Sequence, residues 1–223
     1  MEYTKIFNHN TYRVILKEEE SKMDQCLFDA KDILDTLNIP FYLCTGTALG
    51  FVRDGGFIPH DYDIDIAIDE SECNDSKIIQ SFCKSGKFSK YSYRYLNNLP
   101  IEISFTHNPT GIRIDIFVTY HYENGSYHIL WDVNNQYGTG AGNPILMNYS
   151  PFQKSILTYK GRSFSCPDSN YLSQTYGSTW KTPIDFKKLG GDPYLASLNT
   201  THRPNLLSVE ASRAILEKKF GKF

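Results

Sequence analysis

The chain has 223 residues, of which 40% are hydrophobic and 22% are charged. The length suits one large domain, and the composition suits a globular core, so we expect residues 1–223 to form a single domain. The formal net charge is −2, from 23 basic and 25 acidic residues, and no run is rich in Lys or Arg. This balance excludes a protein that coats nucleic acid by charge, and we expect no nucleic-acid partner.

The cysteines and the lengths of the apolar runs indicate in which cellular compartment the protein is expected. The five cysteines are an odd number without the close spacing of a zinc knuckle, which favours reduced thiols in a reducing compartment. The first residues lack the apolar run of a signal peptide. No stretch approaches the roughly 20 apolar residues that span a bilayer. We therefore expect a soluble, cytoplasmic protein without a transmembrane segment.

The first third of the chain predicts helices alternating with strands. Apolar residues at steps of three and four predict a long helix over 12–37, which Asn38 and Pro40 end. Three shorter elements follow it: a strand over 41–45, a helix over 47–54 and a strand over 63–68. A further amphipathic helix is predicted over 71–84.

The rest of the chain is dominated by strands and hairpins. Strands are predicted over 88–95, 101–106, 112–118 and 127–130, and Asn124-Gly125 is a favourable hairpin turn between the last two. Residues 134–143 are polar and rich in glycine, which predicts a surface loop, and a second hairpin is predicted at Lys160-Gly161. Asp168 is suited to cap a short helix that ends at Gly177, and a last helix is predicted over 208–220. The pattern predicts a mixed α/β sheet flanked by helices.

Carboxylates alternate with apolar residues shortly after Gly46-Thr47. Side chains two apart in a strand lie on the same face, so Asp61, Asp63 and Asp65 should share one face. Neighbouring carboxylates about 7 Å apart repel each other by about 0.6 kcal/mol in water. Folding alone does not explain this repulsion, whereas a divalent cation held between the carboxylates does. The alternative is the solvated face of an edge strand.

A second strand places Asp115 between Ile114 and Ile116, in the same apolar setting. Two or three carboxylates that bind one or two Mg²⁺ ions, with Mn²⁺ as an alternative, are the set that phosphoryl and nucleotidyl transfer require. Gly46 would let the backbone approach a phosphate closely, and Thr47 would open the short helix with its hydroxyl facing an anion. We therefore expect a site for metal and phosphate.

Two further side chains near this motif have open roles. Arg53, six residues after Thr47, would either clamp a phosphate or cap helix carbonyls. His60 would either orient an acceptor or shuttle a proton, or else make a structural hydrogen bond. No serine has a nucleophile-elbow context, and Gly46-Thr47 lacks the lysine of a P-loop.

Three blocks of the chain together resemble the LicD-type transferases, which include bacterial phosphocholine transferases, fukutin and fukutin-related protein. The blocks are Gly46 to Asp65, Arg113-Ile114-Asp115-Ile116-Phe117, and Pro167 to Pro183 with Tyr171, Tyr176-Gly177 and Trp180. They occur in the family's order within residues 38–183. The resemblance leaves out an N-terminal helix over 12–37 and a C-terminal tail over 184–223.

The resemblance implies a nucleotidyltransferase-like fold and a metal-dependent reaction. A phosphorylated alcohol, such as phosphocholine or ribitol phosphate, would move from a CDP-linked donor to a glycan or sugar-phosphate acceptor, and CMP would leave. Asp63 and Asp65 would be metal ligands, and Asp115 a third ligand or the base for the acceptor hydroxyl.

The remaining residues of the motif would lie on the substrate side. The resemblance assigns Gly46, Thr47 and Arg53 to the donor phosphates and places His60 and Asp61 beside the substrates. His60 and Tyr62 stand where the family usually has tryptophan and a further aspartate, which bears on the choice of donor and acceptor. Two rival functions remain: a nucleotidyltransferase that releases pyrophosphate, and a non-catalytic module that binds a nucleotide or glycan.

Overall fold

The computed structural model describes residues 4–8, 11–15, 17–58, 61–132, 143–183 and 205–221. The helices in this part are α1 (Lys17–Thr36), α2 (Thr45–Arg53), α3 (Asp75–Lys84), α4 (Ser169–Tyr176) and α6 (Val209–Phe220). The strands are β1 (Thr4–Asn8), β2 (Thr11–Ile15), β3 (Tyr42–Leu43), β4 (Asp63–Asp69), β5 (Phe88–Leu96), β6 (Leu99–His107), β7 (Arg113–Tyr122), β8 (Gly125–Asp132), β9 (Asn143–Tyr149), β10 (Lys154–Tyr159) and β11 (Arg162–Pro167).

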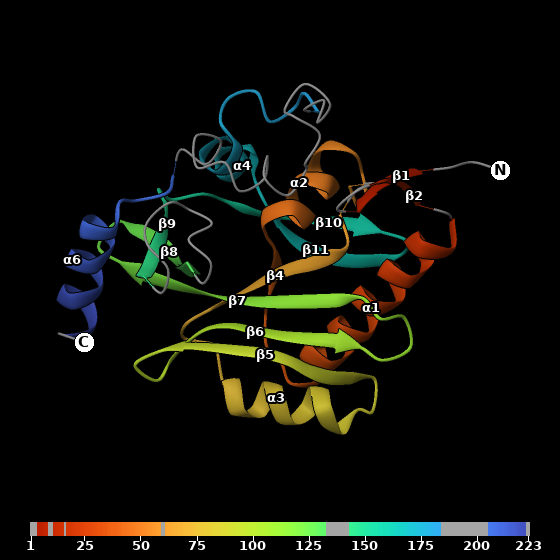
Figure 1. Cartoon of the computed structure of the whole chain (residues 1–223), viewed down its shortest axis with the longest axis horizontal. Helices are drawn as coiled ribbons and strands as arrows, with labels where there is room; N and C mark the ends of the chain where they lie inside the picture. Colours follow the sequence, from red (N-terminus) through yellow and green to blue (C-terminus); the bar gives the residue numbers. More distant parts are fainter. Residues whose placement is uncertain are drawn as a thin grey trace.

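A mixed sheet forms the centre of the described part, with helices around it (Figure 1). Its main path runs in the order β10-β11-β3-β4-β7-β6-β5, and β8 extends it from β7 to β9. The pair that positions the site is β4 and β7, which are parallel and adjacent although about 50 residues separate them. Their register sets Asp63 opposite Arg113 and Asp65 opposite Asp115. The predicted α/β class with a central mixed sheet is confirmed.

One face of these strands is apolar and forms the main core. Ile64 and Ile66 of β4 and Ile114 and Ile116 of β7 are completely buried in one cluster with residues of α1 and α3. Helix α3 lies along β5 and β6 (Figure 1), where its Phe82 ring stacks on Phe105 at 4.4 Å between centroids. Because side chains alternate along a strand, the carboxylates are left on the opposite face.

Most predicted elements are present, and both predicted hairpins are confirmed. Strands β7 and β8 meet at Glu123–Gly125, and β10 and β11 meet at Lys160-Gly161. Asp168 caps α4 by accepting hydrogen bonds from the backbone N–H groups of Asn170 and Tyr171, as expected. Ser208 caps α6 in the same way through the N–H of Ala211.

The predicted helix over 12–37 is wrong at its beginning. Residues Thr11–Ile15 form β2, which pairs with Thr4–Asn8, and α1 begins only at Lys17. Thr, Tyr, Val and Ile favour strands, and the partner strand outweighs the helical periodicity that continues from α1. The predicted helix over 71–84 also begins later, at Asp75, because Asn74 caps it.

Of two other predicted segments, one is shorter in the structure and one lies mostly outside the described residues. The predicted strand over 41–45 shortens to Tyr42–Leu43, because the chain turns into α2 at Thr45. The surface loop predicted over 134–143 falls outside the described residues except for Asn143, which begins β9. The single-domain arrangement stays a prediction.

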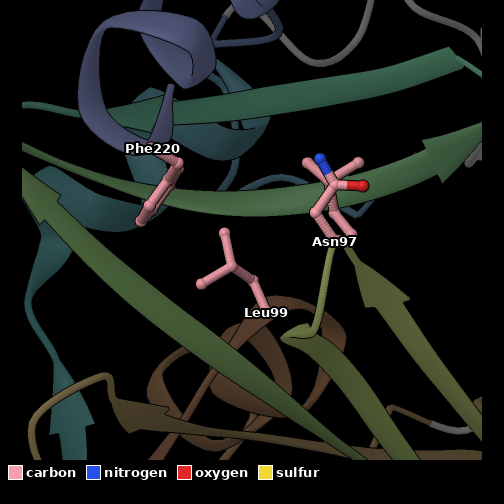
Figure 2. A pocket seen from close by; sticks show the side chains of 4 residues that line it. Asn97, Leu99 and Phe220 are labelled. Carbon is pink, nitrogen blue, oxygen red and sulfur yellow. The ribbon is translucent and has the colours of Figure 1, made fainter. Parts of the chain in front are cut away.

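Helix α6 covers a second, smaller apolar cluster. Its Leu216 packs with Val118 of β7 and Ile129 of β8. Figure 2 shows a pocket between the end of α6 and the β5–β6 turn, lined by Leu96, Asn97, Leu99 and Phe220. In the described part of the chain, none of the helices combines the length and the apolar character needed to cross a membrane.

Gly50 should be essential for packing the end of α2. A Cβ atom at this position would lie 2.5 Å from the carbonyl oxygen of Gly56 and 2.9 Å from the backbone nitrogen of Ile58. These are backbone atoms that cannot turn aside, so Gly50→Ala should lower the free energy of unfolding by about 1–3 kcal/mol. Chemical denaturation measures this loss. Gly56→Ala is the matched control, because its Cβ would meet the Tyr159 ring at an ordinary contact distance of 3.6 Å. Equal stability of the two variants would contradict the prediction.

Candidate active site

Strands β4 and β7 bring three carboxylates from distant parts of the sequence together. One oxygen from each of Asp63, Asp65 and Asp115 lies within 4.8 Å of the others. The parallel register causes this convergence, because it sets Asp65 directly opposite Asp115. The three side chains are referred to below as the acidic triad.

The acidic triad is crowded and poorly solvated. Burial raises the pKa of Asp115 to about 7, and the carboxylates of Glu102 and Asp63 add to the increase while the Arg113 guanidinium opposes it. Burial raises the pKa of Asp65 well above its usual range, and Asp63 and Asp115 raise it further. Holding several ionised carboxylates here is therefore unfavourable unless a cation is present.

Arg113 is the charged partner that the sequence analysis did not assign to the site. Its guanidinium pairs with Asp63 and lies 3.0 Å from Oδ2 of Asp115. The alternation of Arg113 and Asp115 along one strand already places both on one face. The pairing with Asp63 could not be read from the sequence, because it depends on the register of β4 against β7.

The residues present fit a small divalent cation. Asp115 is 5% exposed, and within the described part of the chain its Oδ1 is buried without a hydrogen-bond partner. Such an unsatisfied charged oxygen is costly unless a ligand completes it. Three converging carboxylate oxygens form a hard donor set of the kind that Mg²⁺ and Mn²⁺ prefer.

The beginning of α2 is bonded directly to the acidic triad. The Thr45 hydroxyl donates to Oδ2 of Asp65, and the Thr47 hydroxyl accepts a hydrogen bond from the Asp65 backbone N–H at 2.9 Å. Thr45 has a positive φ of 40°, and its N–H donates to the Tyr171 hydroxyl at 3.0 Å. Tyr171, from α4, therefore holds the turn that orients Asp65.

This arrangement corrects the expected role of Thr47. The helix opens at Thr45, two residues before the predicted start, and the Thr47 side chain is buried against β4 rather than exposed to an anion. Thr45, which sequence reasoning missed, provides the hydroxyl beside the carboxylates. A Cβ at Gly46 would lie 2.6 Å from Oδ2 of Asp61, so glycine is needed here for a close contact with a carboxylate, and its approach to a phosphate stays a prediction.

The other predicted site residues differ in position. Asp61 lies just before β4, and burial together with Asp63 and Asp65 raises its pKa well above the usual range. Arg53 is not brought to the acidic triad. Its guanidinium pairs with Asp54 at 2.7 Å, and its position in α2 is about 12 Å along the helix axis from Thr45. His60 falls outside the described residues.

Comparison with known proteins places this geometry in a family. Residues 38–143 match the family model described as "LicD/FKTN/FKRP, nucleotidyltransferase domain". The chain belongs to the LicD-type family. This match contains α2 and the whole acidic triad, and it ends before the third block of the resemblance at 167–183.

Curated relatives give the same family. Ribitol-5-phosphate transferase FKTN of Mus musculus is 30% identical over 156 residues, which are 70% of this chain and 32% of that protein. The Homo sapiens protein of the same name is 25% identical over 182 residues, or 82% of this chain and 38% of that protein. An uncharacterised Caenorhabditis elegans protein is 32% identical over 78% of this chain and 44% of its own length. The LicD-type chain therefore spans 32–44% of the length of these relatives.

The raised pKa of Asp115 predicts how pH affects the LicD-type site. Its folded value of about 7 lies above that of an unfolded aspartate, so the folded state holds this proton more tightly. The contribution of Asp115 to stability is thus most favourable at low pH and is lost as pH rises from about 4 to 7. Metal binding requires ionised carboxylates in the acidic triad, where the pKa values of Asp65 and Asp115 are both raised, so the rise in Tm caused by Mg²⁺ should be larger at pH 8 than at pH 6.

Differential scanning fluorimetry with and without Mg²⁺ measures this effect. Asp115→Asn should reduce the difference between the two pH values, because asparagine does not titrate, while Asp65, whose pKa is also raised, keeps part of it. An Mg²⁺-induced rise in Tm that is equal at pH 6 and pH 8 in the unaltered protein would contradict the prediction.

Proposed function

We propose that this chain transfers a phosphorylated alcohol from a CDP-linked donor to a hydroxyl of a glycan or sugar-phosphate acceptor, with release of CMP. The transferred group would be a polyol phosphate such as ribitol phosphate, or phosphocholine. The observation that carries the proposal is the convergence of Asp63, Asp65 and Asp115 from two strands beside the start of α2. Relatives named ribitol-5-phosphate transferase support the choice of a polyol phosphate.

The acidic triad would hold Mg²⁺ or Mn²⁺, which when bound neutralises the phosphate charge and polarises the reacting phosphoryl group. The N–H groups at the start of α2, those of Gly46 and Thr47, would bind the donor phosphates, because the first turn of a helix presents unpaired donors and positive potential. Thr45 and Tyr171 would keep this turn and Asp65 in place. Arg113 would balance the charge of Asp63 and Asp115.

The acceptor hydroxyl would attack the phosphorus in line with the departing CMP. Asp115 is the carboxylate on the β7 side, away from α2, and its pKa near 7 suits a group that accepts the hydroxyl proton at neutral pH. Asp115 would act in this way or as the third metal ligand. Asp115→Asn separates these two roles, because loss of a ligand lowers metal affinity whereas loss of a base does not.

Product analysis tests the proposal. The purified chain is incubated with Mg²⁺, a mixture of methyl glycosides and sugar phosphates, and either CDP-ribitol, CDP-choline or CTP, and the products are identified by mass spectrometry. CMP together with a phosphoalcohol-modified acceptor supports the proposal. Pyrophosphate released from CTP would instead support a nucleotidyltransferase. Metal-dependent binding of CDP-ribitol without any product would support a non-catalytic binding module.

A further inference from the structure

The polar face of the sheet continues past the acidic triad, on the side away from α2. The register aligns Asp65 of β4 with Asp115 of β7, Asp115 with Ser104 of β6, and Ser104 with Ser92 of β5. This row of polar side chains crosses four neighbouring strands. The surface toward β5 therefore adjoins the site from the side opposite the proposed phosphate-binding turn.

An irregularity in β5 gives two consecutive side chains to this face. The register of β5 against β6 shifts between Lys90 and Ser92, which leaves Tyr91 as an extra residue. Lys90 and Tyr93 lie together on the α3 side, where the Lys90 ammonium is 4.4 Å from the Tyr93 ring centroid. Tyr91 instead lies against Arg113, whose guanidinium carbon is 5.5 Å from its ring centroid. Bulges of this kind commonly redirect side chains beside active sites.

The surface around Tyr91 has features that suit a polar ligand with an apolar face. Tyr91 is 58% exposed, although it rests on the guanidinium that pairs with Asp63 and Asp115. Two buried polar atoms beside it, Oγ of Ser92 and Nε of Arg113, have no hydrogen-bond partner within the described residues. Buried polar groups are normally paired, so these atoms point to a ligand that would pair with them.

We propose that Tyr91, Ser92 and Arg113 form the binding surface for the sugar ring of the acceptor. This inference rests on the proposed function, because in-line transfer puts the acceptor and the departing nucleotide on opposite sides of the phosphorus. With the donor phosphates at α2, the acceptor enters from the β6–β5 side. An exposed tyrosine ring packs against the C–H face of a sugar, while Ser92 and Arg113 bond its hydroxyl groups.

Saturation-transfer NMR on the full chain tests the surface directly, without turnover. The probes are the methyl glycosides of glucose, galactose, mannose and N-acetylglucosamine. At least one should receive saturation at its ring C–H protons, and Tyr91→Ala should weaken its binding about fivefold or more. Tyr91→Phe should retain binding, because the aromatic ring and not the hydroxyl makes the proposed contact.

Tyr95→Ala is the matched control, because Tyr95 lies on the same strand but bonds Asp75 of α3 at 2.9 Å. It should leave glycoside binding unchanged, and calorimetry should give the same affinity for CDP in all three variants. The inference is overturned if no glycoside binds the unaltered protein or if Tyr91→Ala binds it normally. It is also overturned if Tyr91→Ala weakens CDP binding instead, since the ring would then belong to the donor base. A lack of CMP release would overturn the proposed function alone.

Discussion

Replacing Asp63 or Asp65 with asparagine is expected to reduce the rate of phosphoalcohol transfer by at least about a thousandfold. Both carboxylates belong to the acidic triad, whose oxygens lie within 4.8 Å of one another, and asparagine keeps their shape while removing the charge. Affinity for Mn²⁺ should fall in parallel with turnover, because each variant loses one anionic ligand. The rate of CMP release measures turnover, and calorimetry measures Mn²⁺ binding.

The fold should survive these changes, which separates loss of the site from loss of the protein. Burial and neighbouring carboxylates raise the pKa of Asp65 well above its usual range, so its ionised form is unfavourable in the metal-free protein. Asparagine at this position should therefore leave the metal-free Tm unchanged or raise it, since the Thr45 hydroxyl can still donate to an amide oxygen.

Asp69→Asn is the matched control on the same strand. Its carboxylate pairs with Lys154 at 2.9 Å and with His121 at 3.1 Å, outside the acidic triad. It should retain nearly normal turnover and Mn²⁺ binding. Near-normal turnover of both Asp63→Asn and Asp65→Asn would remove the basis for a metal-dependent transfer at this site.

The local part of the site could be predicted from the sequence because it depends only on alternation. Asp63 and Asp65 share a face of β4 for this reason, and the apolar setting of Asp115 places it on the equivalent face of β7. What alternation does not give is the parallel register between the two strands, so the pairing of Arg113 with Asp63 was not predicted.

The features that were missed depend on contacts far apart in the sequence. Thr45 takes its positive φ where the Tyr171 hydroxyl, 126 residues later, accepts its N–H. Strand β2 was predicted as helix because its partner β1 had not been recognised as a strand. Tyr91 is the extra residue in β5. The sequence does not indicate it, because only the pairing with β6 reveals the register shift. Local propensity does not predict features that depend on such long-range contacts.

Asp115→Asn should lower the rate of transfer at least about a hundredfold, which is the usual contribution of a positioned general base. The variant also separates the two roles open to Asp115. If this carboxylate accepts the acceptor proton, Mn²⁺ affinity changes little while turnover and its dependence on pH are lost. If it is a metal ligand, Mn²⁺ affinity falls together with turnover, as in Asp65→Asn.

Glu102→Gln provides the matched control, because Glu102 is a buried carboxylate of β6, outside the acidic triad, whose charge raises the pKa of Asp115. Each of its oxygens accepts a hydrogen bond, from Arg94 at 2.8 Å and from Ser104 at 2.9 Å, and Glu102 is not one of the carboxylates that converge in the acidic triad. Its replacement should therefore change turnover by less than about tenfold. If Glu102→Gln were as damaging as Asp115→Asn, crowding of negative charge rather than chemistry at Asp115 would explain the loss. If Asp115→Asn kept full activity, the reaction would not depend on this carboxylate of β7. The approach of Asp115 to Asp63 and Asp65 of β4 would then have a structural role only.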